Sequence, residues 1–217
     1  MAGSDRSTDR GTVTRLHNSR ADEAVTVLCD AFREYPVMRY VIGPAGDEYD
    51  SRLGTLVSFF AAARILRKEP VLAVEEAGQV AAVAILTSPG DREAPAELAE
   101  LREKVWQELG SAARQRYETL GRIWQQFTVP EPHYHLNMIG VLRSHAGRGL
   151  ARRLLDAVHE LSRSEPGSSG VSLTTEDPSN VALYEYFGYE IVGHAKVSDG
   201  FETWAFFRRD AENQGVN

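Results

Sequence analysis

A glycine-containing loop is the stretch of this sequence whose residue types and spacing point most directly to a ligand. It runs from Val141 to Ala151 and carries Gly147 and Gly149 between a β-rich segment and a helix with an apolar stripe. Amide groups at the start of such a helix converge on one point, where the helix dipole adds partial positive charge. Glycines let the backbone approach a pyrophosphate, and the small Ala151 keeps the first helical turn open. The loop therefore predicts a phosphate site.

The loop does not have the spacing of two common nucleotide-binding motifs. A dinucleotide-binding fingerprint requires a small residue where this chain has Arg152, and no Gly-Lys-Ser/Thr follows as a P-loop requires. Four arginines nevertheless lie in this short part of an acidic chain, and their positive field suits the phosphates of a cofactor. They are Arg143, Arg148, Arg152 and Arg153. A tight turn followed by a solvated helix face is the alternative interpretation.

A second stretch, Asp177–Tyr189, has the start and stop signals of a short helix. Asp177 can accept hydrogen bonds from the amides of the first turn, and Pro178 suits the first helical position. Gly188 suits the left-handed backbone position that follows a helix. A helix from Pro178 to Phe187 is therefore expected.

The expected helix presents two different pairs of side chains. Asn180 and Tyr184 are four residues apart and therefore share one face. Leu183 and Phe187 form a second, apolar pair, which is expected to turn towards the core. The polar groups of this helix thus lie together on the first face.

Both stretches resemble signatures of the GNAT superfamily of acetyl-CoA-dependent N-acyltransferases. The loop resembles its acetyl-CoA motif, Gln/Arg-x-x-Gly-x-Gly/Ala, with Ala146 in place of the usual Gln or Arg. The helix resembles the second signature, which implies that Asn180 contacts the cofactor and that Tyr184 protonates the leaving thiolate. A phenol with a reference pKa of about 10 stays protonated at neutral pH and can donate to a thiolate, whose reference pKa is about 8.5.

The resemblance also implies which residues bind acetyl-CoA and which transfer protons. Backbone amides near Ile139–Val141 are expected to polarise the thioester carbonyl. By their positions on the strands, Glu176, His135, His133 and Tyr134 are the candidates for the base that takes a proton from the amine, and we take Glu176 with Tyr184 as the catalytic residues. A structural role for each histidine and a proton relayed by water are the alternatives. No metal ion is expected. The predicted cofactor-binding residues are Ile139, Gly140, Val141, Arg143, Ala146, Gly147, Arg148, Gly149, Leu150, Ala151, Asn180 and Tyr184.

The elements that must position these residues follow from hydrophobic periodicity and turn signals. Strands are expected at Thr12–Leu16, Val71–Glu75, Val80–Leu86, His133–Leu142, Val171–Thr175, Tyr189–Val192 and Phe201–Arg208. Helices are expected at Arg20–Tyr35, where Pro36 ends the helix, and at Tyr49–Lys68, Leu150–Ser162 and Pro178–Phe187, with two more in an insert, Ala94–Gln126, broken near Gly110. The fold class is α/β. The resemblance implies a GNAT fold, in which helices flank a mixed, mostly antiparallel sheet and a helical insert precedes the cofactor-binding strand.

Length and composition favour one globular domain of 217 residues with a formal net charge of -7. The domain is expected to span residues 12–209, between a disordered end at 1–11 and a flexible end at 210–217. The acidic balance argues against nucleic acid as a partner, and no apolar run suits a signal peptide or a membrane span. The single cysteine, Cys29, is expected to be buried and fits a cytoplasmic location. Either a monomer or a homodimer is possible.

Further features resemble the puromycin N-acetyltransferase-like branch of the superfamily. They are Ala31-Phe32 with Tyr35-Pro36, the helical insert, and Phe201-x-Thr203-Trp204. Those relatives commonly have Glu at the position of Thr174, and this departure weakens a role towards puromycin itself. If the likeness holds, the insert and the region Arg20–Lys68 wall the acceptor site and contribute the aromatic residues Tyr35, Phe59, Trp106 and Trp124.

Three functions remain open at this point. The first is acetylation of a small-molecule amine, which attacks acetyl-CoA directly. The second is acetylation of a protein or peptide amine, which needs an open groove where the insert would otherwise form a lid. The third is a domain that binds CoA without turnover. Asn180 and Tyr184 favour an enzyme.

Overall fold

A seven-stranded sheet in the order β1-β2-β3-β4-β5-β7-β6 organises the chain. It is seen in a computed structural model that describes residues 12–90 and 94–211. All neighbouring strands are antiparallel except β4 and β5, which confirms the expected mixed, mostly antiparallel α/β fold. The strands are β1 (Val13–Arg15), β2 (Val71–Glu76), β3 (Gln79–Thr87), β4 (Tyr134–Val141), β5 (Gly170–Thr175), β6 (Glu190–Ser198) and β7 (Phe201–Arg209).

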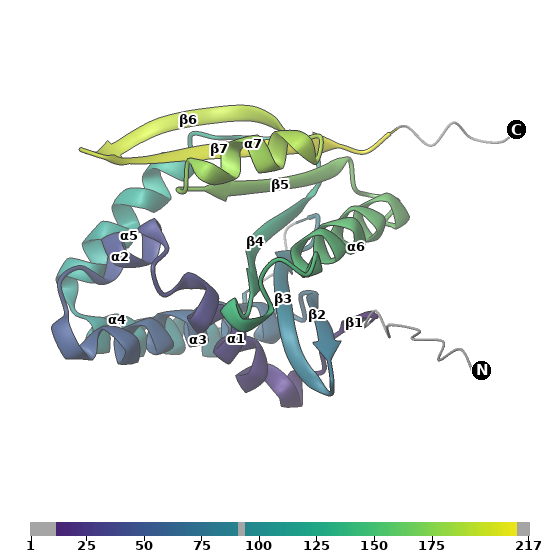
Figure 1. The fold of residues 1–217 in the computed structure, drawn as a ribbon. Coiled ribbons are helices and arrows are strands. Elements are labelled where there is room, and N and C mark those ends of the chain that lie inside the picture. Colours follow the sequence, from purple (N-terminus) through teal and green to yellow (C-terminus); the bar gives the residue numbers. More distant parts are fainter. Residues whose placement is uncertain (1–11, 91–93, 212–217) are drawn as a thin grey trace, which may run out of the picture.

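Helices cover both faces of the sheet, as Figure 1 shows. One buried cluster joins α1, α2, α3, α4 and α5 to one face, with Leu28, Leu56 and Leu120 fully buried. The other joins α6 to the opposite face through Leu154 and Val158. Central strand β3 is buried on both faces, because each is covered. The helices are α1 (Ala21–Phe32), α2 (Pro36–Ile42), α3 (Tyr49–Leu66), α4 (Ala96–Leu109), α5 (Ser111–Trp124), α6 (Leu150–Ser164) and α7 (Ser179–Tyr186).

The expected helical insert is present as α4 and α5, and Gly110 breaks it with a φ of 85°. The role predicted for Pro36 was wrong. Helix α1 already ends at Phe32, and Pro36 opens the short helix α2, which was not predicted from the sequence. Proline suits the first position of a helix as well as it terminates one, because its missing amide is not needed there. Cys29 is half-buried rather than fully buried.

Strands β4 and β5 separate halfway along their length. They pair in parallel only through residues 134–136 and 171–173, after which β4 continues along β3 and β5 continues along β7 (Figure 1). Asn137 is an extra residue in β4, since its neighbours Leu136 and Met138 pair with the consecutive residues Leu86 and Ile85. Such a bulge bends a strand and re-aims its side chains. The divergence opens the sheet at the carboxyl ends of both strands.

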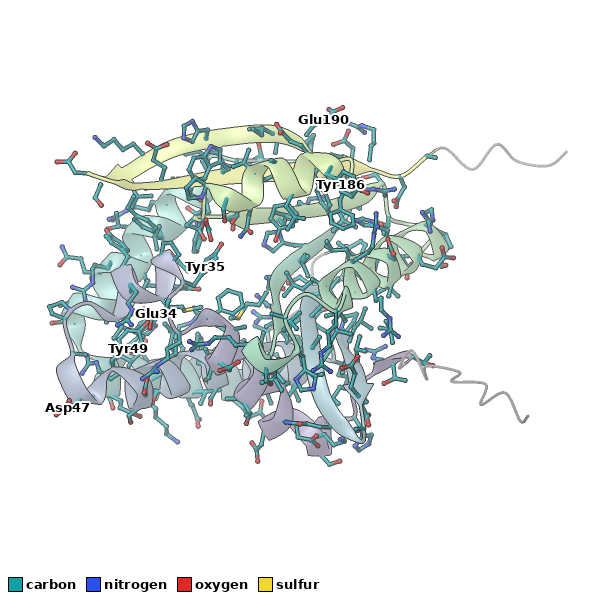
Figure 2. The ribbon with its side chains drawn as sticks, viewed as in Figure 1. Glu34, Tyr35, Asp47, Tyr49, Tyr186 and Glu190 are labelled. Atoms are coloured by element: carbon teal, nitrogen blue, oxygen red, sulfur yellow. The ribbon has the colours of Figure 1, made fainter. Side chains whose placement is uncertain are left out.

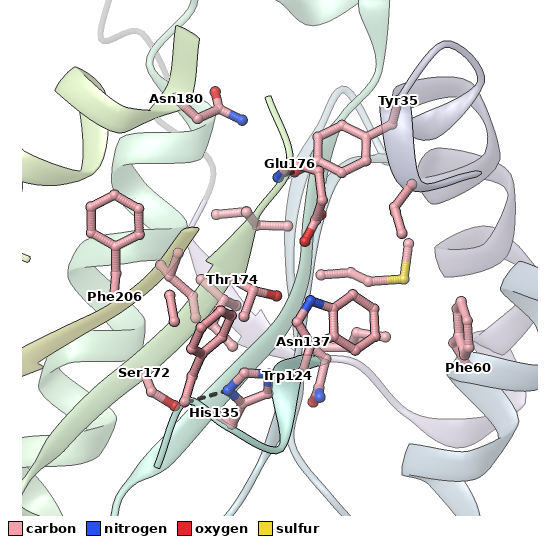
Figure 3. A pocket seen from close by; sticks show the side chains of 18 of the residues that line it. Tyr35, Phe60, Trp124, His135, Asn137, Ser172, Thr174, Glu176, Asn180 and Phe206 are labelled. Carbon is pink, nitrogen blue, oxygen red and sulfur yellow. Dashed lines mark hydrogen bonds between the residues drawn. The ribbon is translucent and has the colours of Figure 1, made fainter. Parts of the chain in front are cut away.

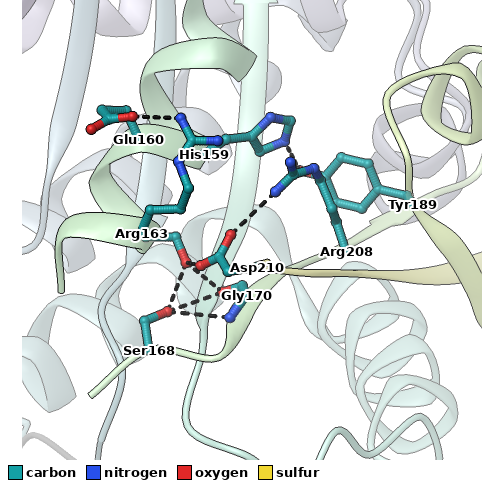
Figure 4. A network of polar contacts seen from close by, with 9 residues as sticks. His159, Glu160, Arg163, Ser168, Gly170, Tyr189, Arg208 and Asp210 are labelled. Atoms are coloured by element: carbon teal, nitrogen blue, oxygen red, sulfur yellow. Dashed lines mark hydrogen bonds and ion pairs between the residues drawn. The ribbon is translucent and has the colours of Figure 1, made fainter. Parts of the chain in front are cut away.

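The end of β7 is fixed to α6 by a polar network (Figure 4). The Ser162 hydroxyl donates to the Asp210 carboxylate over 2.6 Å, and Arg208 lies 3.1 Å from the same carboxylate. His159 and the Tyr189 hydroxyl are 3.0 Å apart in the adjoining core. The expected disordered end, residues 1–11, lies outside the described residues, and so do residues 212–217 of the expected flexible end. In the part of the chain that is described, no helix is long and apolar enough to cross a membrane.

Candidate active site

A pocket of about 560 Å³ lies where β4 and β5 diverge. Its walls come from β4 and β5, from residues of β3, β6 and β7, and from α1, α2, α3, α5 and α7, and they are largely apolar and aromatic (Figure 3). Arg64 and Glu176 are the charged side chains among the described lining residues. A mostly apolar pocket with a few convergent polar groups is the usual form of a small-molecule site.

Helix α7 brings two of the predicted site residues to this pocket. Asp177 accepts from the Ser179 amide over 2.9 Å, and Gly188 has a φ of 81°, so the predicted roles of Asp177 and Gly188 are confirmed, although the helix is one residue shorter at each end than predicted. Asn180 and Tyr184 both line the pocket. The predicted orientation of Leu183 was wrong: its side chain is 44% exposed. The face that carries Tyr184 packs on the sheet instead, because aromatic residues of β7 meet it there.

Tyr184 is held rigidly while its hydroxyl stays free. Its ring lies 5.6 Å from the ring of Phe206 and 5.7 Å from that of Tyr189, and only 7% of the residue is exposed. No described residue hydrogen-bonds its hydroxyl. Burial, and secondarily the nearby Glu176, raise the pKa of Tyr184 to about 12. The phenol is therefore protonated at neutral pH and available as a proton donor.

Glu176 is a buried carboxyl group at the end of β5, only 5% exposed. Its Oε1 atom accepts a hydrogen bond of 2.8 Å from the Thr203 hydroxyl, and the Trp124 indole donates to the same hydroxyl oxygen over 3.1 Å. Burial raises the pKa of Glu176 from its ordinary 4.5 to about 7, against the opposing effect of these hydrogen bonds. A carboxyl group with this pKa can accept a proton near neutral pH.

Tyr35 ties the helical layer to the end of β5. Its hydroxyl lies 2.8 Å from the Thr175 hydroxyl and accepts from the Glu176 amide over 3.1 Å. The Asn180 side chain donates to the same Thr175 oxygen over 3.2 Å. Figures 2 and 3 show Tyr35 in the space between the helical layer and the strands. The network fixes the backbone from which Glu176 and Asn180 project.

The other three candidate bases are less suited to accept a proton. His135 lines the pocket and contacts the Ser172 hydroxyl over 2.8 Å (Figure 3), but burial lowers its pKa to about 4. Its ring is neutral but a weak base. His133, the residue before β4, has its Nδ1 atom 2.6 Å from the Glu131 carbonyl oxygen. Tyr134 is buried in the cluster on the α6 face, away from the pocket. The arrangement favours Glu176.

The loop before α6 presents a row of unused backbone donors. Gly147 and Gly149 both have a φ of 77°, and added Cβ atoms would meet open space. From Gly147 onward, the first amide that donates to a backbone carbonyl is that of Arg153, which bonds to the Gly149 carbonyl over 3.2 Å. No described group accepts from the amides of residues 147–152. Free amides at a helix start suit an anion, so this loop, with Ala146, Leu150 and Ala151, fits the pyrophosphate of CoA.

Strand β4 directs alternate backbone groups into the gap. The Leu142 amide donates to the Ala81 carbonyl over 2.9 Å, so this pair is hydrogen-bonded in the antiparallel ladder with β3. Hydrogen bonding alternates along such a ladder, so Gly140 bonds towards β3 while Ile139 and Val141 point the other way. Their amides therefore face the space that β5 has left. This is where an acyl carbonyl needs donors.

Gly140 serves a different purpose from its two neighbours. A Cβ atom on it would lie 2.9 Å from the Cβ atom of Ala31 and 3.2 Å from a methyl group of Leu28. Contacts this close require a glycine. The structure thus places Gly140 in the packing of α1 on β4, and not at the gap.

The arginines of the loop do not form a free positive cluster. The Arg143 amide donates to the Asp30 carboxylate over 2.6 Å, and its Nε atom lies 3.3 Å from the same carboxylate. Arg148 pairs with Glu76 over 2.9 Å. Both side chains remain about half exposed. The acidic partners offset part of the field that the sequence suggested, so the backbone amides carry most of the expected anion recognition.

Arg152 links α6 to α7. It donates to the Tyr186 hydroxyl over 2.9 Å, and its guanidinium carbon lies 5.4 Å from the centroid of that ring. Tyr186 is 70% exposed, and Figure 2 labels it on α7 where this helix lies close to α6. The contact joins the two helices that carry the loop amides and Tyr184.

The fold and site together define an acyltransferase of the GNAT type: a sheet split between β4 and β5, a loop of free amides, and a buried tyrosine beside the gap. The sequence model of the Acetyltransferase (GNAT) family matches residues 28–189. The chain belongs to this family, which confirms the acetyltransferase class expected from the two motifs.

Solved structures with this fold include several acetyltransferases. A Corynebacterium glutamicum structure, named as histone acetyltransferase HPA2 and related acetyltransferase, is 20% identical, with a TM-score of 0.68 and coverage of 95% of this chain and 99% of that chain. Agmatine N-acetyltransferase is 18% identical, with a TM-score of 0.58 and coverage of 93% and 100%. An N-acetyltransferase from Staphylococcus aureus is 14% identical, with a TM-score of 0.54 and coverage of 93% and 99%. Among curated proteins, no sequence matches the chain.

Arg64, which lines the pocket, and Thr203, which bonds to Glu176, had no predicted role. Arg64 interrupts the apolar side of α3 one turn after Phe60, and a charge on such a face is the signal that could have found it. Thr203 lies in the quoted Phe201-x-Thr203-Trp204 segment, but only the fold shows that it reaches Glu176. Among the four expected wall aromatics, Tyr35 and Trp124 line the pocket. Phe59 and Trp106 are core residues.

Proposed function

We propose that the protein transfers an acetyl group from acetyl-CoA to the amine of a small molecule. The observation that carries this proposal is that Glu176 and Tyr184 line one pocket, where one is suited to accept a proton and the other to donate one. Glu176, with a pKa of about 7, can accept a proton, while Tyr184, with a pKa of about 12, holds one. Environments that push two such groups apart are typical of acid–base pairs.

The proposed reaction is a direct displacement at the thioester carbonyl. The amine nitrogen forms a bond to the carbonyl carbon, and Glu176 removes a proton from the nitrogen, either directly or through a water molecule. The amides of Ile139 and Val141 donate to the carbonyl oxygen as it gains charge. The carbon–sulfur bond then breaks, and Tyr184 gives its proton to the sulfur. The products are an N-acetyl amide and CoA.

A small-molecule acceptor is favoured over a protein by the shape of the pocket. Its volume of about 560 Å³ is within the range of small-ligand sites. Residues of α2 and α5 line the pocket on the side of the helical layer, which leaves less room for a peptide than an open groove would. The likeness to agmatine N-acetyltransferase supports a small amine, whereas the name of the Corynebacterium structure keeps a protein acceptor as the alternative.

Some finer expectations stay predictions. They are the kinship with the puromycin N-acetyltransferase-like branch, a cytoplasmic location, a monomeric or homodimeric state, and the absence of nucleic-acid and membrane partners. The third function, CoA binding without turnover, is disfavoured by the free hydroxyl of Tyr184, since a binding domain has no need of an unpartnered donor at this position.

The test is a screen of small amines and of peptides with acetyl-CoA, read by release of the CoA thiol and by the mass of the product. Turnover of small amines supports the proposal. Turnover of peptides alone would move the assignment to a protein acetyltransferase, and tight binding of acetyl-CoA without any turnover would leave a binding domain.

A further inference from the structure

Arg64 is a charged side chain of the pocket that forms no ion pair with any of the described residues. Its Nε atom is buried without a hydrogen-bond partner, and no described residue forms an ion pair with it. Burial lowers the pKa of the Arg64 guanidinium, yet an arginine stays charged at any physiological pH. Arg64 is half-buried, and a charge held partly out of water without a partner is costly, so we expect an anion to complete the site.

A second arginine shows that this situation is not general in the chain. Arg52 also has a buried Nε atom without a partner. However, its guanidinium donates to the Leu109 carbonyl and lies 3.6 Å from the Glu48 carboxylate, so its other end is satisfied. Arg52 does not line the pocket. Arg64 differs in having neither contact and in facing a cavity.

The surroundings of Arg64 place it away from the acetyl-transfer end. It lies one helical turn beyond Phe60 on α3, and Figure 3 shows Phe60 on the far side of the pocket from Asn180. Tyr117 of α5 is close enough that Arg64 counteracts the increase of its pKa caused by burial. Arg64 also contributes to the lowered pKa of His135. This end therefore carries positive charge beside neutral donors.

The nearest acidic group does not satisfy Arg64. Glu69 influences its pKa less than Tyr117 does, and no ion pair joins the two side chains. The Glu69 carboxylate is buried and accepts instead from the Ser88 amide over 2.8 Å. A guanidinium offers paired donors that match a carboxylate or phosphate. The fork of Arg64 is left for a ligand.

We propose that the acceptor carries an acidic group, most simply a carboxylate, which binds Arg64 while its amine lies beside Glu176. This inference rests on the proposed function for the place of the amine, but the anion site itself does not. Between the two charged residues the walls are aromatic, with Phe32, Phe60 and Trp124. The acceptor class is therefore an amino acid with an apolar body, and a second cationic group, as in a diamine, is disfavoured.

The anion site can be tested without turnover. We would measure binding of 3-phenylpropionate and of its uncharged amide, 3-phenylpropanamide, to wild type, Arg64→Met, Arg64→Lys and Arg52→Met. Wild type and Arg52→Met should prefer the carboxylate about ten- to a hundredfold, as expected for a charged hydrogen bond. Arg64→Met should lose the preference and Arg64→Lys should keep part of it. Equal binding of both probes to wild type, no binding of either, or an unchanged preference in Arg64→Met would overturn the proposal.

A second arm separates this inference from the proposed function. 4-(Aminomethyl)phenylacetate, whose ring separates its amine from its carboxylate, and its decarboxylated form, 4-methylbenzylamine, are compared as acceptors by kcat/KM. At least a tenfold advantage of the amino acid in wild type, lost in Arg64→Met, supports the acidic acceptor. Equal turnover of both would overturn it while leaving the acetyltransferase intact. If neither amine nor any other were acetylated although the carboxylate preference held in binding, the proposed function would fail and the anion site would stand.

Discussion

The Thr203 hydroxyl donates to the Glu176 carboxylate over 2.8 Å in the buried space between β5 and β7. The direction of this bond is fixed when Glu176 is ionised, because a carboxylate can only accept; the Trp124 indole, which can only donate, bonds to the Thr203 oxygen over 3.1 Å. The proton of the hydroxyl is thus committed to Glu176. A donor aimed at the carboxylate favours its charged form and keeps the pKa from rising further.

Thr203→Val removes this donor while preserving the shape of the side chain. The pKa of Glu176 should rise, so the pH at which activity reaches half its maximum should move upward by up to about one unit. At pH 7 the rate should fall several-fold, and at pH 9 it should largely recover. The measurement is a profile of kcat/KM against pH for both proteins. A loss that is the same at every pH would show that Thr203 only supports the fold.

Glu176→Gln removes the proposed base. The base must be deprotonated to work, so wild-type kcat/KM should rise with pH through about 7, the pKa of Glu176, and then level off. The variant should lose this rise and be slower by about a hundred- to a thousandfold above pH 8. Comparison of the two pH profiles is the measurement. If the rise persisted unchanged in Glu176→Gln, another group would be the base.

The same substitution should affect stability in the opposite sense. The pKa of Glu176 is about 7 in the folded protein and near 4.5 when unfolded, so the folded state favours the neutral carboxyl. That contribution is complete below pH 4.5 and is lost as pH rises to 7, because the buried group must then ionise. At pH 8, Glu176→Gln should therefore be more stable than wild type by about 3 kcal/mol and melt at a higher temperature, whereas at pH 5 it should gain little. Melting curves at both pH values test this, and equal differences would contradict it.

The phosphate loop can be tested by filling it. Gly149→Trp should abolish the increase in melting temperature that acetyl-CoA causes, because a bulky side chain obstructs the amides of the helix start. Gly200→Trp is a matched control, since Gly200 has a similar φ of 72° in open space but lies in the β6–β7 turn. The control should keep the full shift. A folded Gly149→Trp protein that still responds to acetyl-CoA would refute the loop as the cofactor site.

The sequence was informative wherever local signals determine structure. The capped helix α7, the break of the insert at Gly110 and the strand–loop–helix around Gly147 follow from turn and cap chemistry. These are interactions between residues near in sequence. The orientation of Leu183 does not follow from such local interactions, because its burial depends on which face of α7 meets β7. Pro36 was ambiguous for a related reason: proline fits both beside a helix end and at a helix start.

The site was predicted in part. Asn180 and Tyr184 of the second motif do share a pocket with Glu176, which ends the strand just before that motif. The split of β4 from β5 and the pairing of Glu176 with Thr203 were not visible. Both depend on contacts between segments 27 residues or more apart in the chain. Arg64 was missed because a lone arginine in a helix is usually exposed, and only the fold shows that it has no partner.

The central claim is that Tyr184 protonates the departing thiolate, and Tyr184→Phe tests it most directly. The variant keeps the ring contacts with Phe206 and Tyr189 and should bind acetyl-CoA nearly as wild type does. Single-turnover rates are measured for both proteins with acetyl-CoA and with an activated thioester whose thiol leaves more easily. With acetyl-CoA the variant should be slower by about a hundred- to ten-thousandfold, or about 3–5 kcal/mol of barrier, and the loss should shrink with the activated donor. Equal rates of both proteins on acetyl-CoA, with chemistry as the slow step, would contradict the account and leave Tyr184 as a packing residue.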